Sequence, residues 1–124
     1  MIDFLRSVFG KKTQPLNKIY INPRAYLQNF EYLQSLHPHN ALFPVIKSNA
    51  YGHGLKEIAS ILKDVPLTYL CIDSFPEYAI ASKYNKHNYL VLSETNAENY
   101  RLYNWKRVAF AISSFHGLEY FAKK

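Results

Sequence analysis

The stretch LFPVIKSNAYGHG, residues 42–54, joins a compact apolar run to a lysine and two glycines. Three further apolar runs follow along the chain, at residues 69–72, 89–92 and 108–112, and each precedes a helix-like stretch. Short apolar runs that alternate with helices are typical of parallel strands covered on both faces. The sequence therefore predicts an α/β protein with about four βα units. Such a number suits either a small doubly wound sheet or one half of an eight-stranded barrel.

A short strand and a helix are expected to precede these units. Residues 18–21 have the apolar character of a short strand, and Asn22 with Pro23 provides an N-cap followed by a proline in the first helical turn. An apolar helical face is predicted from residues at spacings of three, namely Leu27, Phe30, Leu33 and Leu36. Residues 1–16 are expected to be a leader, and residues 17–124 a single partial domain.

Composition and charge exclude several classes of protein. The 124 residues are 48% hydrophobic and 16% aromatic, which is enough to bury a core and excludes general disorder. The formal net charge is +6, but the basic residues are scattered, so a solvated basic surface is favoured over a nucleic-acid-binding tail. One cysteine, Cys71, excludes an intrachain disulfide framework and a multi-cysteine metal site, and fits a reducing cytoplasm. No run approaches the length of a membrane span.

The chemistry is expected at Lys47, which follows the first apolar run where α/β proteins build their sites. Burial of its stem would disfavour the charged form, and a neutral amine can attack an aldehyde. Gly52 and Gly54 flank His53 and would let backbone N–H groups approach an anion, while Tyr51 adds a hydroxyl. A carbonyl-reactive amine beside an anion cradle is what pyridoxal phosphate requires. The alternatives are an ordinary surface lysine and a simple turn before a helix.

The octapeptide KSNAYGHG, residues 47–54, resembles the cofactor-lysine signature of the alanine racemase family, a pattern with little freedom. Further segments resemble the family's first strand and helix and its later barrel strands: residues 19–22, 70–77, 90–92 and 108–114. Ser93 departs from the family, which more usually has glycine after the third strand. The resemblance covers residues 17–122.

This resemblance implies the N-terminal half of a TIM-type (β/α)8 barrel. It also implies a cytoplasmic, pyridoxal phosphate-dependent racemase that interconverts L- and D-alanine for peptidoglycan precursors. Lys47 would hold the cofactor and act as an acid/base group at the substrate α-carbon, Tyr51 would contact the phosphate, and Leu92 would form an apolar wall. His53 would either face the ligand or make a structural hydrogen bond. No metal, nucleic acid or membrane is implied, and complete family members are homodimers.

Racemisation by two bases requires a second proton carrier on the opposite face of the substrate. In the alanine racemase family this carrier is a tyrosine of a C-terminal β domain, supplied by the partner subunit. The chain is therefore expected to be an N-terminal fragment that does not racemise alanine efficiently by itself. Two other interpretations remain. One is a non-catalytic protein that binds pyridoxal phosphate, and the other, suggested only by the pI, is a basic nucleic-acid-binding α/β domain.

Overall fold

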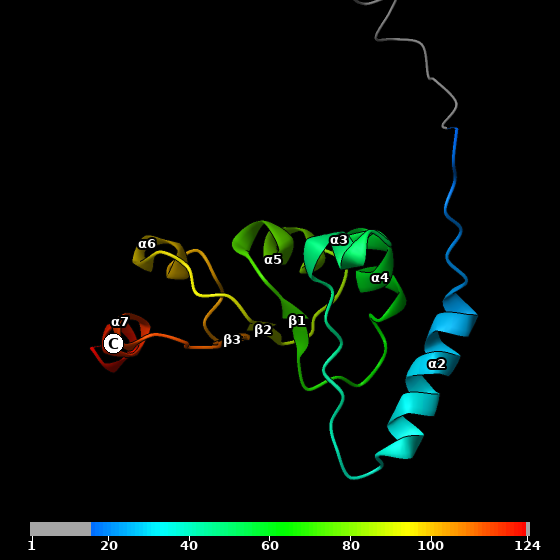
Figure 1. The fold of residues 1–124 in the computed structure, drawn as a ribbon, viewed down its shortest axis with the longest axis horizontal. Helices are drawn as coiled ribbons and strands as arrows, with labels where there is room; N and C mark the ends of the chain where they lie inside the picture. The colour runs from blue at the N-terminus through cyan, green and yellow to red at the C-terminus, as the bar shows by residue number, and fades with distance from the viewer. Residues whose placement is uncertain (1–15, 124) are drawn as a thin grey trace, which may run out of the picture.

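The computed structural model describes residues 16–123 and shows helices alternating with the strands of a parallel sheet (Figure 1). The helices are α2 (Pro23–Leu36), α3 (Lys47–Tyr51), α4 (Leu55–Ile61), α5 (Phe75–Ala81), α6 (Ala97–Tyr100) and α7 (Phe115–Ala122). The strands are β1 (Leu70–Ile72), β2 (Tyr89–Val91) and β3 (Val108–Phe110). The expected α/β class is confirmed. The leader expected at residues 1–16 lies almost wholly outside the described residues.

The sheet has the order β1-β2-β3, and both pairs of neighbours run parallel. In register, Cys71 lies opposite Leu90, and Leu90 lies opposite Ala109. Consecutive parallel strands that are neighbours in the sheet, each joined to the next through a helix, are the arrangement of one sector of a barrel. Because all strands run the same way, their carboxyl ends lie along a single edge, and the loops after the strands meet there.

The first apolar run forms less strand than predicted. It runs parallel to β1 only through a bridge between Val45 and Cys71. Around this bridge the Cys71 N–H donates to Pro44 O at 2.8 Å, and the Ile46 N–H donates to Cys71 O at 2.9 Å. Pro44 has no N–H to offer a second neighbour, which limits this run as a strand.

The strand expected at residues 18–21 is absent, so that prediction is wrong. Ile19 and Tyr20 are exposed, and within residues 16–123 no strand lies beside this segment to complete its backbone hydrogen bonds. The helix that follows does form as predicted. Asn22 Oδ1 accepts the Ala25 N–H at 3.2 Å, and Pro23 stands in the first turn. In Figure 1 this helix, α2, stands to one side of the sheet.

The core lies between the sheet and helices α4 and α5. Its largest fully buried side chains come from the end of the first apolar run, helix α4 and its C-cap, and strands β1 and β2: Ile46, Ile58, Leu62, Leu70, Ile72, Tyr89 and Val91. Among the described residues, no helix is long and apolar enough to cross a membrane. Helix α6 ends at Tyr100, because the N–H groups of Leu102 and Tyr103 return to carbonyls three residues back and form turns.

Candidate active site at the carboxyl edge of the sheet

The segment after the first apolar run is a left-handed helical turn. Ser48, Asn49, Ala50 and Tyr51 all have φ between 52° and 56°. For a residue with a Cβ, this left-handed conformation is less favourable than the right-handed one by roughly 1–2 kcal/mol. The turn is held because Ala50 is buried and its N–H donates to Ile46 O at 2.9 Å. Such strain at a functional segment persists only where its surroundings fix it.

The end of the turn is tied to helix α4. Asn49 Oδ1 accepts the Leu55 N–H at 2.8 Å, so the asparagine side chain caps the following helix. Gly52 and Gly54 have φ of 87° and 99°, a backbone conformation that glycine adopts without steric cost. The two glycines are therefore required by the path of the backbone between the turn and the helix.

Lys47 lies at the start of this turn with its amine beside a carboxylate. Lys47 Nζ lies 3.7 Å from Asp73 Oδ2, and the two side chains are 36% and 31% exposed. Asp73 follows the last residue of β1, and the Ser93 hydroxyl, beyond the end of β2, donates to Asp73 Oδ1 at 2.6 Å. Three neighbouring loops thus bring a lysine, a carboxylate and a hydroxyl together at the sheet edge.

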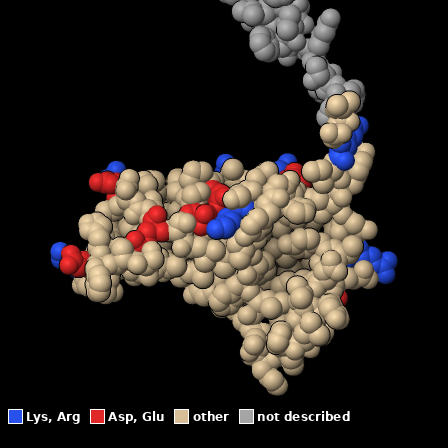
Figure 2. Space-filling view, viewed as in Figure 1, with Lys and Arg blue, Asp and Glu red and all other residues tan. Residues whose placement is uncertain are grey.

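Glu77 of α5 joins the first two of these loops. Its Oε1 accepts the Ser48 N–H at 2.6 Å, and its Oε2 accepts the Asp73 N–H at 2.8 Å. Charge-assisted hydrogen bonds of this kind are stronger than those between neutral groups. One carboxylate therefore fixes the backbone both of the lysine turn and of the aspartate. Figure 2 shows acidic side chains gathered around a basic patch on this face of the molecule.

Glu94 makes the corresponding link between the last two loops. Its Oε1 accepts the N–H groups of Ser113 and Ser114 at 2.7 Å and 2.8 Å. The Ser114 hydroxyl, together with these two amides, holds the pKa of Glu94 below its usual range. Ser114 also caps α7, because its Oγ accepts the Gly117 N–H at 3.0 Å. Polar side chains thus connect all four loops along the edge.

The anion cradle predicted at residues 52–54 is not formed, so this prediction is wrong. The N–H groups of Gly52, His53 and Gly54 donate to carbonyls of Ser48, Asn49 and Ala50, at 3.0 to 3.2 Å. The left-handed turn closes on itself and uses the donors that an anion would need. The His53 ring is bonded in the same turn, with Nδ1 2.9 Å from Ala50 O.

The other two residues expected at the site lie on two different loops. Tyr51 ends the turn and is 61% exposed. Leu92 is half-buried after β2, and its N–H donates to Ile72 O at 2.9 Å, which places it next to Ser93 at the same sheet edge. Sequence reasoning missed Asp73, Glu77 and Glu94 as members of this edge, and noticed Ser93 only as a departure from the family. The signal that pointed to Lys47, a polar residue just after an apolar run, was also present at Asp73 and Ser93.

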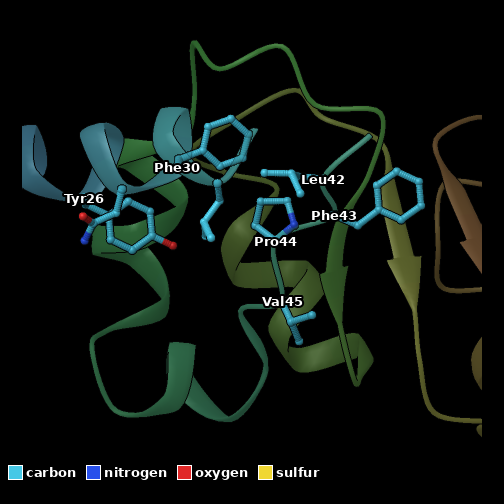
Figure 3. Close-up of a pocket in the computed structure, with 8 residues that line it drawn as sticks. Tyr26, Phe30, Leu42, Phe43, Pro44 and Val45 are labelled. Atoms are coloured by element: carbon cyan, nitrogen blue, oxygen red, sulfur yellow. The ribbon is translucent and has the colours of Figure 1, made fainter. Parts of the chain in front are cut away.

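An apolar pocket of about 330 Å³ lies elsewhere, between α2 and residues 42–45 (Figure 3). Tyr26 and Phe30 line it from the helix, and Leu42, Phe43 and Pro44 line it from the extended run. The pocket contains neither Lys47 nor any residue of the polar edge. The described residues contain no group of three or more histidine, cysteine, aspartate or glutamate side chains that could hold a metal ion.

The parallel βα units define one half of a TIM-type barrel, with Lys47 at the carboxyl ends of its strands. The sequence model of the family described as "Alanine racemase, N-terminal domain" matches residues 21–124, and the chain belongs to this family.

Individual relatives agree with this assignment. The alanine racemase of Lawsonia intracellularis is 27% identical over 111 residues, which are 86% of this chain and 28% of that protein. The alanine racemase of Edwardsiella ictaluri is 50% identical over 42 residues, covering 34% of this chain and 12% of that protein. The crystal structure of alanine racemase from Oenococcus oeni has a TM-score of 0.70 at 22% identity and covers 82% of this chain, which confirms the fold. The chain spans less than a third of these relatives.

Proposed function

We propose that this chain carries the cofactor lysine of a pyridoxal phosphate-dependent racemase that interconverts L- and D-alanine, with Lys47 as the residue that holds the cofactor. The observation that carries the proposal is the placement of Lys47. Its partly exposed amine lies at the carboxyl edge of the parallel strands, 3.7 Å from the Asp73 carboxylate. The family assignment supports the choice of reaction.

The residues present fit pyridoxal phosphate in their chemistry. A partly exposed primary amine can reach an aldehyde, the half-buried Leu92 offers an apolar surface, and the exposed Tyr51 offers a hydroxyl. The backbone N–H groups of residues 52–54 are already bonded within the turn, so they offer the phosphate no donor. On the family resemblance, we assign the phosphate contact of this chain to the Tyr51 hydroxyl.

Pyridoxal phosphate, when bound, supplies the electron sink that stabilises a carbanion at the substrate α-carbon. Lys47 would hold the cofactor through its amine. Lys47 Nζ would also take the proton from the substrate α-carbon or return one to it, as a positioned acid/base group. The left-handed turn limits where this amine can reach, because Ser48 and Ala50 on its C-terminal side are held by Glu77 and Ile46.

We extend the proposal to the wider properties of the family. Residues 17–124 would form part of a cofactor-binding barrel domain of a homodimeric cytoplasmic enzyme that supplies D-alanine for peptidoglycan. A two-base racemisation needs a second proton carrier opposite Lys47. In the family that group belongs to a domain outside the region matched at residues 21–124.

The test is attachment of the cofactor to the full chain. Incubation with pyridoxal phosphate should produce a near-visible absorption band, and borohydride should fix the label on Lys47, as located by mass spectrometry. Lys47→Arg should abolish the band and the label. Lys63→Arg is the matched control, because Lys63 also pairs with an aspartate at 3.7 Å but lies on a well-exposed surface. Labelling spread equally over the lysines in the unaltered chain would overturn the proposal.

A further inference from the structure

We propose that Asp73 and Ser93 form a positioning pair for Lys47: the Asp73 carboxylate holds the lysine amine, and the Ser93 hydroxyl fixes that carboxylate. This inference rests on the proposed function, because it gives Lys47 a positioning partner. Its test uses a readout that does not require the cofactor. Neither Asp73 nor Ser93 lies within the octapeptide from which the site was predicted.

The two oxygens of Asp73 have separate partners. Oδ1 accepts the Ser93 hydroxyl at 2.6 Å, and Oδ2 lies 3.7 Å from Lys47 Nζ. A short hydrogen bond to one oxygen restricts rotation of the carboxylate, so the other oxygen remains turned toward the amine. The backbone of Asp73 is fixed as well, since its N–H donates to Glu77 Oε2 at 2.8 Å. The carboxylate is thus held from both its main chain and its side chain.

The hydrogen bond to Asp73 requires the hydroxyl group of Ser93. Glycine, which the family resemblance leads one to expect after this strand, has no hydroxyl and could not bond Asp73. The serine is positioned by β2, whose register with β1 sets Val91 opposite Ile72. Asp73 lies one residue beyond Ile72, and Ser93 lies two residues beyond Val91. Both residues therefore lie at the carboxyl ends of neighbouring strands. The pair is therefore a product of strand register.

The pair has a defined effect on the amine. The Asp73 carboxylate, 3.7 Å from Lys47 Nζ, would hold the amine in place at the carboxyl edge of the sheet. The other ionisable groups of this turn are Tyr51, His53 and, on α5, Glu77. Both oxygens of Glu77 are engaged by backbone N–H groups, and the His53 ring is engaged by Ala50 O.

The experiment is acetylation of each lysine in the full chain by acetic anhydride at one pH, followed by mass spectrometry, with the rate at Lys47 expressed relative to the rates at the other lysines. Asp73→Asn should raise the relative rate at Lys47 by about two- to threefold, because the amine loses the carboxylate that holds it and water screens this one-third exposed pair. Ser93→Ala should raise the relative rate by less. Asp73→Glu and Ser93→Thr, which keep the charge and the hydroxyl, should restore the original rate.

Asp64→Asn is the matched control, because it removes the other described Lys–Asp pair, at the same 3.7 Å distance, without touching Lys47. An unchanged relative rate at Lys47 in Asp73→Asn, in a chain whose circular dichroism is normal, would overturn the proposal. If Asp73→Asn does not fold, Ser93→Ala decides the matter by the same criterion. A raised relative rate in Asp73→Asn, together with an unaltered chain that takes no label from pyridoxal phosphate, would retain this pair and reject the proposed function.

Discussion

Glu77 Oε1 accepts the backbone N–H of Ser48 at 2.6 Å, so a helix that follows β1 holds the first residue of the left-handed turn after Lys47. The turn cannot be stable from its own sequence alone, because consecutive residues with φ near 50° are disfavoured for L-amino acids. A carboxylate from a neighbouring βα unit offsets part of this cost. The conformation of the lysine segment therefore depends on a residue remote in sequence.

Removing the Glu77 carboxylate should loosen this turn and lower stability. We expect Glu77→Ala to reduce the free energy of unfolding by about 2 kcal/mol, since two backbone N–H groups lose a charged acceptor. Glu77→Gln keeps one acceptor oxygen and should reduce it by less. Urea denaturation followed by circular dichroism measures both. Glu31→Gln on the exposed side of α2 is the control, and equal stability of Glu77→Ala and the unaltered chain would contradict the expectation.

Two substitutions in the left-handed turn should have opposite effects on the free energy of unfolding. Ser48 is exposed with φ 52°, so Ser48→Gly removes a Cβ from a strained conformation and should raise the free energy of unfolding by up to about 1 kcal/mol. Gly52 has φ 87°, and a Cβ at this position would meet nothing within 4 Å, so Gly52→Ala should lower it by about 1 kcal/mol through backbone strain alone. Thermal unfolding of both variants checks this, and effects of the same sign would show that the turn is not left-handed in solution.

The sequence predicted the repeating order of apolar runs and helices because burial on both faces of a parallel sheet imposes an apolar period that is visible without a structure. It also placed Lys47 at the carboxyl end of a run, since the end of an apolar stretch is a local feature. The N-cap at Asn22 was predictable for the same reason: its partner, Ala25, is three residues away.

What could not be predicted depends on partners distant in sequence. The left-handed conformation of the turn after Lys47 depends on the hydrogen bond to Glu77. The N–H groups of residues 52–54 donate to carbonyls within this turn, and no local pattern in the sequence predicts these hydrogen bonds. The pairing of Asp73 with Ser93 requires the register of β1 with β2. The strand expected at residues 18–21 failed because apolar character does not supply a neighbouring strand.

Two buried tyrosines should titrate late and make the fold sensitive to alkali. Burial raises the pKa of Tyr89 and of Tyr103 to about 12, above the value near 10 of an unfolded tyrosine. Their contribution to stability is present below pH ~10 and is lost as pH rises through their folded pKa values. A spectrophotometric titration should show a late fraction of tyrosinate that decreases in Tyr89→Phe and in Tyr103→Phe. Titration of all tyrosines together, with the fold intact, would contradict this.

The same two tyrosines should differ at neutral pH. The Tyr89 hydroxyl donates to Asn85 Oδ1 at 2.6 Å, so Tyr89→Phe should reduce the free energy of unfolding by about 1 kcal/mol. The Tyr103 hydroxyl is the one buried side-chain polar atom of the described residues that has no hydrogen-bond partner. Tyr103→Phe removes an unsatisfied group and should leave stability unchanged or raise it slightly. Urea denaturation of the two variants in parallel tests the difference, and a larger loss in Tyr103→Phe would refute it.

Glu94 should make stability depend on pH at the acid end. Its pKa is lowered, chiefly by the Ser114 hydroxyl and then by the N–H groups of Ser113 and Ser114, so the ionised carboxylate is favoured in the folded chain. A group with a depressed folded pKa contributes stability above its unfolded value near 4.5, and this contribution is lost as pH falls through the folded pKa. Glu94→Gln should therefore unfold at a lower temperature than the unaltered chain at neutral pH, and the difference should shrink as the solution is acidified.

Thermal unfolding at a series of pH values measures this convergence. Glu119→Gln on α7 is the control, because it changes the net charge by the same amount as Glu94→Gln and leaves the hydrogen bonds of the Ser113 and Ser114 amides in place. If the difference between Glu94→Gln and the unaltered chain were the same at neutral and acid pH, the stabilisation would come from packing of the side chain. A difference that disappears on acidification identifies the ionised carboxylate as the group that joins the last two loops of the edge.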